Sequence, residues 1–588
     1  MIASLASRID AALSDAFVSL GLPVEFARSA PSGRPDLADY QCNGAMAAAK
    51  KLGRPPREVA GTIVSVLSLR PEFAEVSVAG PGFVNMRLSA ALLIEVARAQ
   101  TEDPDFCLAR AATRERIIID FGGPNVAKPL HVGHLRSLVI GESLRRILSS
   151  CGHHVLSDVH LGDWGLQMGQ LISELEIRQP HLPYFNAAFT GPYPQTPPVT
   201  LADLESMYPA AAAACKVDPR RLDAARKATA DLQTGHPGYR ALWEAFRELS
   251  LAAQKRDFHD LGVHFDLFGG ESDAAPLIEP LISDLTAKGV ADESDDAIVV
   301  AVAEPDDSKP MPPLLLAKAD GSALYATTDL ATLADRVARL RAHRIIYVVD
   351  QRQALHFEQV FRAARKAGLA RSCKLEHVGF GTVNGKDGKA LKTRDGGTVK
   401  LADLLADAVA TASKRLEVSE HGKDMPPRQR AVLARKIGIG AVKFADLSSN
   451  RISGYMFDPE RLVSFEGRTG PYLQYACVRI ASILGKAAAR SELIGPVSPQ
   501  HPAERALALE CLRFPDVVAS AATALLPSEI ADYAFSLAQR FSRFYADCPV
   551  LGEIDQQARA SRLALCGLSR AALSRALWML GIDVPERM

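Results

Sequence analysis

The sequence PNVAKPLHVGH at residues 124–134 is the most informative stretch of the chain. It follows an apolar run of strand length, RIIID at residues 116–120, and it precedes LRSLVIG at residues 135–141, which begins a helical pattern. The order is therefore strand, Gly/Pro-rich loop and helix. Such a connection directs unpaired backbone N–H groups and the positive end of a helix dipole beyond the strand, where phosphate binds.

The two histidines of this stretch favour a nucleotide site. His131 and His134 are three residues apart and share one face of the first helical turn, and Gly133 leaves room for a flat ring against the backbone. Two imidazoles at a helix start can stabilise the charge that builds on an α-phosphate during attack. The alternative is a metal pair, but metal-binding histidines on helices are usually four apart, and no Glu follows here as in the zinc protease pattern.

Composition indicates a multidomain globular protein. The 588 residues are 48% hydrophobic and 23% charged, and 68 acidic side chains balance 68 basic ones. This neutrality argues against a non-specific nucleic-acid coat protein without excluding a local basic surface. Nine dispersed cysteines without a Cys-x-x-Cys pair predict reduced core thiols. Without a signal-peptide pattern or an apolar run of bilayer length, we expect a cytoplasmic protein with no membrane partner.

The patterning divides the chain into three parts with different secondary structure. Residues 1–110 predict a small α+β unit, residues 111–450 an α/β doubly wound parallel sheet, and residues 451–588 a helical bundle. From about residue 172 to about residue 262, the alternation of strands and helices is interrupted by a Pro-rich segment and long helical runs, which indicates a helical insertion.

Individual elements follow from periodicity. The predicted strands lie at residues 73–78, 83–88, 117–120, 153–156, 345–350 and 375–380. The predicted helices include residues 2–20, 59–67, 503–513, 528–544 and 556–580. In a parallel sheet, the loops after the strands at 117–120 and 345–350 share the carboxyl edge, where ligands bind.

In its context, the 124–134 stretch resembles the first signature of class I aminoacyl-tRNA synthetases, in the form typical of bacterial arginyl-tRNA synthetases. Residues 162–167 (GDWGLQ), 265–272 (FDLFGGES), 324–329 (LYATTD) and 349–356 (VDQRQALH) resemble further motifs of that family, in order and spacing. The resemblance covers nearly the full length. It implies a Rossmann-type catalytic domain with a helical insertion, an N-terminal α+β domain that binds the tRNA elbow, and a C-terminal α-helical anticodon-binding bundle.

The resemblance also implies the reaction, in which arginine and ATP form arginyl-adenylate and arginine then passes to tRNA(Arg). ATP with Mg²⁺ is the expected nucleotide substrate, with no protein-ligated metal, no DNA partner and a monomeric chain. The implied catalytic residues are His131, His134, Lys128 and Lys392. The implied ATP-binding residues are Pro124, His131, Gly133, His134, Lys389, Lys392 and Arg394.

The second signature departs from the family's usual Lys-Met-Ser-Lys-Ser. The corresponding loop, residues 386–398, contains GKALKTRDGG at 388–397. A solvated basic hairpin is the alternative interpretation. Arginyl enzymes are known for such departures, and a Lys at the position of Lys128 is thought to compensate; it lies three residues before His131 and could reach the same phosphate oxygens.

An arginine substrate requires acids, because a guanidinium presents a planar fork of donors to carboxylates. Glu271 ends a predicted strand, Tyr325 and Asp329 are four apart on one helical face, and Gln353 follows the 345–350 strand. Each of these alone is more often a cap or a surface pair. The family resemblance joins them, with Asn125, into an arginine-binding set; Asp163 is instead a candidate helix cap.

The tRNA contacts are implied by the resemblance at both ends of the chain. They are Asn85 in the N-terminal unit and Tyr472, Tyr475, Tyr545 and Met588 in the C-terminal bundle. Exposed tyrosines can stack on unpaired bases, although ordinary core packing is the more frequent role of a single tyrosine.

Rival functions remain at this point. Another class I synthetase or a small-molecule nucleotidylyltransferase would lack the N-terminal unit and the acid set. A catalytically silent tRNA-binding paralogue should have lost His131 or His134, and both are present.

Overall fold

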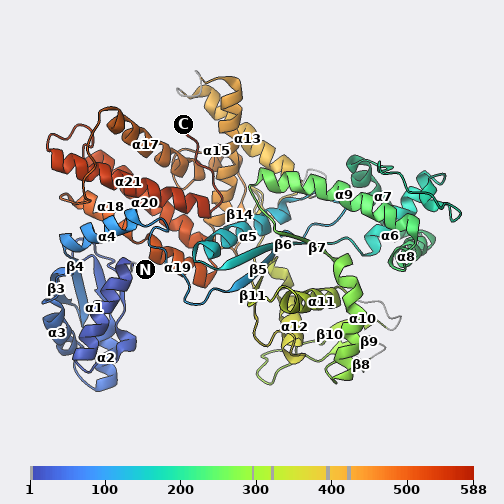
Figure 1. Ribbon diagram of the computed structural model, residues 1–588, viewed down its shortest axis with the longest axis horizontal. Helices are drawn as coiled ribbons and strands as arrows, with labels where there is room; N and C mark the ends of the chain where they lie inside the picture. Colours follow the sequence, from blue (N-terminus) through green and yellow to red (C-terminus); the bar gives the residue numbers. More distant parts are fainter. Residues whose placement is uncertain (1–3, 295–296, 319–323, 393–397, 420–424) are drawn as a thin grey trace.

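The computed structural model describes residues 4–294, 297–318, 324–392, 398–419 and 425–588. Figure 1 shows the N-terminal unit, in blue, beside the orange and red C-terminal helices, with the green insertion helices at the opposite end of the molecule. The central sheet lies between them.

The central sheet has five parallel strands, which confirms the predicted fold class. Their order is β12-β11-β5-β6-β7. The strands are β5 (Arg116–Phe121), β6 (His154–Leu161), β7 (Leu267–Gly270), β11 (Arg344–Val348) and β12 (Lys374–His377). Because the chain leaves β5 toward β6 and later adds β11 on the other side of β5, the strand order reverses between β5 and β11, and ligands bind at such a point.

Helices cover both faces of this sheet. Ile117 and Ile119 belong to the core beneath α5 (Val132–Ser150), whereas Ile118 belongs to the core beneath α11 (Tyr325–Ala338) and α12 (Ala354–Lys366). All three isoleucines are fully buried. A strand covered on both faces has a continuous apolar run rather than an alternating one, as this sequence has.

The N-terminal unit packs helices on an antiparallel sheet of order β1-β2-β4-β3. Its elements are α1 (Leu5–Ser19), η1 (Val24–Phe26), β1 (Ser29–Pro31), β2 (Tyr40–Cys42), α2 (Gly44–Leu52), α3 (Pro56–Leu67), β3 (Phe73–Ala79), β4 (Phe83–Leu88) and α4 (Ala90–Glu102). Of the helix predicted over residues 2–20, residues 2 and 3 lie outside the described residues. Arg505 of the C-terminal bundle donates to Asp39 and to the Leu88 carbonyl, which joins the two ends of the chain.

The insertion has a core of its own, centred on Leu171, Leu204, Leu232 and Phe246. Its elements are α6 (Leu166–Arg178), η2 (Pro183–Phe185), α7 (Leu201–Val217), α8 (Pro219–Gln233) and α9 (Pro237–Asp260). After α10 (Glu271–Ala287) comes an antiparallel sheet that the sequence did not predict, formed by β8 (Asp292–Ser294), β9 (Ala297–Val300) and β10 (Leu314–Lys318).

The remaining elements are mostly helices, and from residue 451 on the chain is helical apart from the two-residue strand β14, as predicted. Its elements are η3 (Gln351–Gln353), β13 (Val383–Asn384), α13 (Leu401–Val418), α15 (Pro427–Leu447), β14 (Tyr455–Met456), α16 (Pro459–Leu462), α17 (Gly470–Ala489), α18 (Pro502–Leu512), α19 (Phe514–Ala524), α20 (Pro527–Asp547) and α21 (Gln556–Met579). In the described part of the chain, no helix has the length and apolarity needed to cross a membrane.

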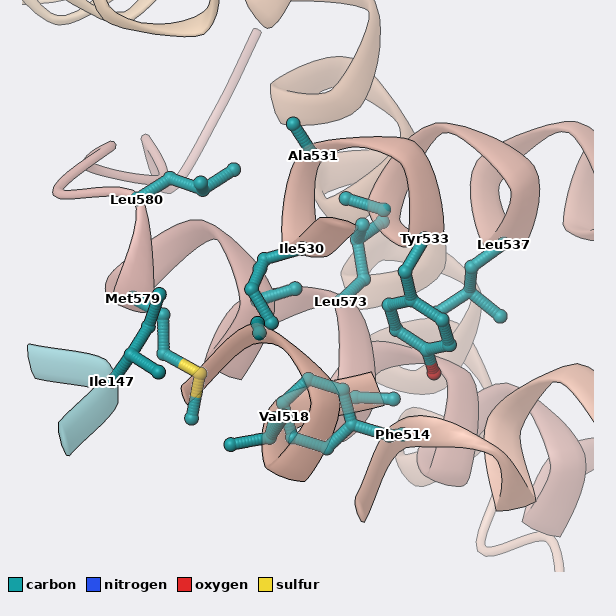
Figure 2. Close-up of a cluster of buried hydrophobic side chains, with 14 of the residues drawn as sticks. Ile147, Phe514, Val518, Ile530, Ala531, Tyr533, Leu537, Leu573, Met579 and Leu580 are labelled. Carbon is teal, nitrogen blue, oxygen red and sulfur yellow. The ribbon is translucent and has the colours of Figure 1, made fainter. Parts of the chain in front are cut away.

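Helix α5 joins the sheet to the C-terminal bundle. Figure 2 shows Ile147, near the end of α5, in one apolar cluster with Phe514 of α19, Ile530 of α20 and Met579 of α21. The other end of α5 is the start of the 131–134 motif. One rigid element therefore runs from the bundle to the edge of the sheet.

Candidate active site

A cavity of about 260 Å³ opens at the carboxyl ends of the central strands. It is lined by the predicted residues Asn125, His131, Gly133, His134, Glu271, Tyr325, Asp329 and Gln353, and also by Asp120, His160 and Asp350. Residues more than two hundred positions apart in the sequence thus face one space. The cavity lies at the reversal point between β5 and β11, where the sheet topology places a ligand.

The two histidines are held as neutral hydrogen-bond donors. The His131 backbone N–H donates to Nδ1 of His134 at 3.0 Å, and the Gly133 N–H donates to Nδ1 of His131 at 3.0 Å. Burial lowers the pKa of His134 from 6.5 to about 3, and burial together with the charge of Lys128 lowers the pKa of His131. With Nδ1 accepting, each neutral ring carries its proton on Nε2.

Gly133 is required by the His131 ring. A Cβ added at Gly133 would lie 2.8 Å from Cε1 and 2.9 Å from Nδ1 of His131. The two imidazole rings lie 3.9 Å apart between centroids. Any side chain at Gly133 would therefore displace the ring that caps helix α5.

Burial of His134 has a consequence for stability. Below about pH 6.5 the unfolded chain protonates this histidine, whereas the folded chain resists protonation until about pH 3. We expect the free energy of unfolding to fall as the pH decreases through that window. In His134→Asn, which keeps an acceptor for the His131 N–H but has no ionisable group, the fall should be shallower. Urea unfolding at a series of pH values measures both slopes, and equal slopes would contradict the assignment.

Acidic and phenolic groups gather at the opposite end of the cavity. Asp329 Oδ2 lies 2.6 Å from Nε2 of His356. Tyr325 is 54% exposed, and it is the charge of Asp329 that raises the pKa of Tyr325, so its hydroxyl stays protonated. Burial also raises the pKa of Glu271, against the opposing effect of the Trp164 N–H, which donates to Oε2 at 3.2 Å. Carboxylates with a phenol beside them suit a planar cation.

Asn125 is seated by a glycine on the neighbouring strand's loop. A Cβ at Gly162 would lie 2.1 Å from Oδ1 of Asn125. The Val126 N–H donates to the Gly162 carbonyl at 3.0 Å, and the Gly162 N–H donates to the Pro124 carbonyl at 3.1 Å. Pro124 thus holds the loop through its backbone.

Asp163 caps a helix, which agrees with the sequence interpretation. The Ser272 N–H donates to it at 3.0 Å, the Ser272 hydroxyl at 2.8 Å, and Nε of Arg247 at 3.0 Å. Ser272 lies in the first turn of α10, directly after Glu271. Asp163 therefore fixes the helix start that carries Glu271.

The segment around the second signature is tied to the first by its backbone. The Val132 N–H donates to the Val399 carbonyl at 2.9 Å, and the Leu401 N–H donates to the Leu130 carbonyl at 2.9 Å. His131 and Lys400 form an antiparallel bridge. Although the two segments are far apart in sequence, the base of the 386–398 loop is thereby held beside the histidine motif.

The predicted lysines do not line the cavity. Nζ of Lys128 lies 4.4 Å from the ring centroid of Tyr208 in helix α7. Lys389 and Lys392 are exposed on the hairpin, and Arg394 lies outside the described residues. Lys128 thus lies close enough to His131 for its charge to lower the pKa of that histidine, but its ammonium group packs on Tyr208, outside the cavity.

The predicted tRNA contacts in the C-terminal bundle differ in exposure. Tyr475 is 40% exposed and Tyr545 is 37% exposed. The Arg479 guanidinium lies 4.3 Å from the Tyr545 ring centroid, so a cation and an aromatic face share this surface. Tyr472 is partly buried, and its hydroxyl lies 3.2 Å from that of Ser542.

The remaining two predicted tRNA contacts are more enclosed. Asn85 is only 7% exposed, and its Oδ1 accepts a hydrogen bond from Gln41 at 2.8 Å. Met588 packs against the cluster around Leu433 of α15. Their roles stay predictions.

Among the residues that line the cavity, the sequence analysis did not single out the ionisable side chains of Asp120, His160 and Asp350. Asp120 is near the end of β5, His160 near the end of β6, and Asp350 just after β11. Polar residues at the carboxyl ends of parallel strands were the available signal. The predicted strand at 153–156 stopped short of His160, which hid that residue.

Three sequence families match the chain. The model described as "tRNA synthetases class I (R), catalytic domain" matches residues 98–459, "Arginyl tRNA synthetase N terminal domain" matches residues 3–88, and "DALR anticodon binding domain" matches residues 473–588. The first of these covers more than half of the chain.

Curated relatives and a solved structure match over the full length. A protein of Maricaulis maris named Arginine--tRNA ligase is 50% identical over 586 residues, with 100% of both chains covered. One of the same name from Hyphomonas neptunium is 49% identical over 587 residues, again with 100% of both covered. The arginyl-tRNA synthetase structure of Thermus thermophilus has a TM-score of 0.80 and 26% identity, and the match covers 99% of this chain and 100% of that one.

Proposed function

Because the chain belongs to the arginine–tRNA ligase family of class I aminoacyl-tRNA synthetases, we propose that the cavity at the carboxyl edge of its central sheet is where arginine and ATP react. The chain ligates L-arginine to tRNA(Arg) with ATP, through arginyl-adenylate, and so supplies arginyl-tRNA for protein synthesis. One observation carries the site assignment: neutral imidazole donors and an acidic recognition set face the same cavity.

The histidines act on the phosphate. The arginine carboxylate attacks the α-phosphorus of ATP and pyrophosphate leaves, so negative charge grows on the α-phosphate oxygens. Nε2–H groups of His131 and His134 donate to those oxygens without themselves titrating, which is consistent with their lowered pKa values. Gly133 and Pro124 shape the loop around the nucleotide, and Lys128, Lys389, Lys392 and Arg394 supply cations to the phosphates after the loop closes.

The other end of the cavity selects arginine. Glu271 and Asp329 accept from the guanidinium, and Tyr325 and Gln353 complete the polar wall. Asn125 holds the backbone end of the amino acid near the histidines. The two carboxylates balance the charge of the arginine guanidinium. An uncharged side chain of the same shape would leave them without a cation, so the site discriminates against an uncharged isostere of arginine.

The tRNA is bound at both ends of the chain. The domains are residues 1–110 for the tRNA elbow, 111–450 for catalysis, with the insertion at about 172–262 and the loop at 386–398, and 451–588 for the anticodon. Asn85 contacts the elbow, and Tyr472, Tyr475, Tyr545 and Met588 contact the anticodon region. The exposed Tyr545 beside Arg479 supports this assignment, because bases stack on aromatic rings and on guanidinium planes.

We infer further properties of the enzyme from those common in this family. ATP enters as its Mg²⁺ complex, with the metal carried by the nucleotide. The enzyme acts as a monomer in the cytoplasm, without DNA or a membrane as partner.

Exchange of pyrophosphate into ATP tests the assignment. We expect exchange with arginine when tRNA(Arg) is present and negligible exchange without it. The reason is that Lys128, Lys389 and Lys392 lie outside the cavity here, so that tRNA must shift the population toward a closed state. Each other amino acid serves as a control. Exchange with a different amino acid would refute the arginine site, and robust exchange without tRNA would refute the coupling alone.

A further inference from the structure

Helix α11 carries a buried arginine two turns beyond its recognition residues. Tyr325, Asp329 and Arg336 are spaced by four and seven residues, so they lie on one face of α11. Tyr325 and Asp329 line the active-site cavity. Arg336 points from the same face into the protein and is 2% exposed.

Arg336 fastens α11 to three strands of the central sheet. Its Nη2 lies 2.6 Å from Oδ2 of Asp120 on β5 and 2.6 Å from Oδ2 of Asp158 on β6. Its Nε donates to Asp158 at 3.1 Å. Its guanidinium carbon lies 5.5 Å from the ring centroid of Tyr347 on β11. A planar fork can bridge two carboxylates in this way, whereas an ammonium group is a single point charge.

This charged layer separates two cavities. Asp120 lines the active-site cavity, whereas Asp158 and Arg336 line a second cavity of about 440 Å³ on the other side. His160 lines both. On its other side, α11 packs through Leu330 and Leu333 into the apolar core beneath the sheet, and the ion pairs of Arg336 fix the end of the helix that lies between the two cavities.

Arg336 also determines which carboxylates a substrate guanidinium can reach. Asp120 faces the same cavity as Glu271 and Asp329, and its carboxylate is likewise an acceptor for a guanidinium. Since Arg336 already engages Oδ2 of Asp120, this carboxylate cannot offer both of its oxygens to the substrate, whereas Glu271 and Asp329 have no arginine partner among the residues that the structure describes. An internal arginine thus fills the position at which a substrate arginine would bind unproductively.

We propose that Arg336 is a positioning residue for arginine recognition, because it anchors the helix that presents Tyr325 and Asp329 and withholds Asp120 from the substrate. This proposal rests on the arginine site proposed above. Arg336 thereby contributes to the selection of arginine without touching the substrate.

The test is Arg336→Met in the full-length enzyme, assayed by aminoacylation with tRNA(Arg). The KM for arginine should rise on the order of tenfold to a hundredfold, since a recognition group displaced by about one ångström costs that much. The KM for ATP should stay within about twofold of the wild-type value, because the histidine motif is on a different element. Arg336→Lys, which keeps the charge without the fork, should fall between Arg336→Met and the wild type.

Matched variants separate positioning from general loss of structure. Arg344→Met removes another buried arginine. Arg344 is the first residue of β11, at the end of the strand away from the cavity, and it pairs with Glu376 of β12, so this variant should leave the KM for arginine unchanged. Arg339→Met removes an exposed arginine at the C-cap of α11 and should do the same. If Arg336→Met fails to fold, Asp158→Asn tests the same anchor with Asp120 still engaged and should raise the arginine KM by a smaller factor.

The outcomes distinguish this proposal from the site on which it rests. An unchanged arginine KM in a folded Arg336→Met enzyme, or equal rises for arginine and ATP, would overturn the positioning role. If Asp329→Asn raises the arginine KM while Arg336→Met does not, the arginine site stands and only the anchor fails. If neither variant affects arginine, the site itself is wrong.

Discussion

His134→Ala is expected to slow arginyl-adenylate formation by roughly 10²–10³-fold while arginine and tRNA still bind. The Nδ1 of His134 accepts the His131 backbone N–H at 3.0 Å, so its Nε2–H is the group that remains for the α-phosphate. Burial lowers the pKa of His134 to about 3, and the ring therefore donates as a neutral group throughout the working pH range. Single-turnover adenylate formation with tRNA present measures the chemical step directly.

Two further substitutions separate the roles of the two ring nitrogens. His134→Asn retains an acceptor at the Nδ1 position, and should be folded but about as slow as the alanine variant. His134→Gln places an amide N–H near the Nε2 position, and should recover part of the rate. Equilibrium binding of arginine is the control, and it should not change in any of the three. Near-normal adenylate formation in His134→Ala would show that His134 does not act on the α-phosphate.

The strand, loop and helix around the histidines could be predicted from the sequence because their determinants are local. The isoleucine run at 117–119 is buried on both faces, and Gly133 leaves room for the His131 ring. The acidic residues of the arginine site could be assigned to a single site only through the family resemblance. Glu271 and Asp329 come from different helices, and no local sequence pattern predicts that α10 and α11 face the same cavity.

What escaped prediction depends on contacts between distant segments. The Arg336 layer joins residues 178 and 216 positions apart, and a buried arginine in a helix has no distinctive periodicity. The ammonium group of Lys128 packs on the ring of Tyr208 in the insertion, a contact that the spacing of Lys128 from His131 could not anticipate. The small sheet β8–β10 is built from short strands, two of them with mixed exposure, so it gave no alternating signal.

Asp329→Asn is expected to raise the KM for arginine on the order of a hundredfold and to leave the KM for ATP nearly unchanged. Asp329 is 8% exposed, and Nε2 of His356 occupies its Oδ2 at 2.6 Å, which leaves Oδ1 as the acceptor for a substrate guanidinium. A neutral amide cannot balance that cation, and a buried charge left underpaired costs several kcal/mol. Pyrophosphate exchange at varied arginine and then at varied ATP gives the two constants separately.

Asp335→Asn is the matched control for Asp329→Asn. Asp335 lies on the same helix, but its ion-pair partner Arg339 is 67% exposed, and neither residue lines the active-site cavity. Because exposed pairs contribute little, this variant should leave both constants as they are. If Asp329→Asn raises the two constants equally, then Asp329 supports the fold through His356 rather than binding the substrate, and Glu271 alone would have to recognise the guanidinium.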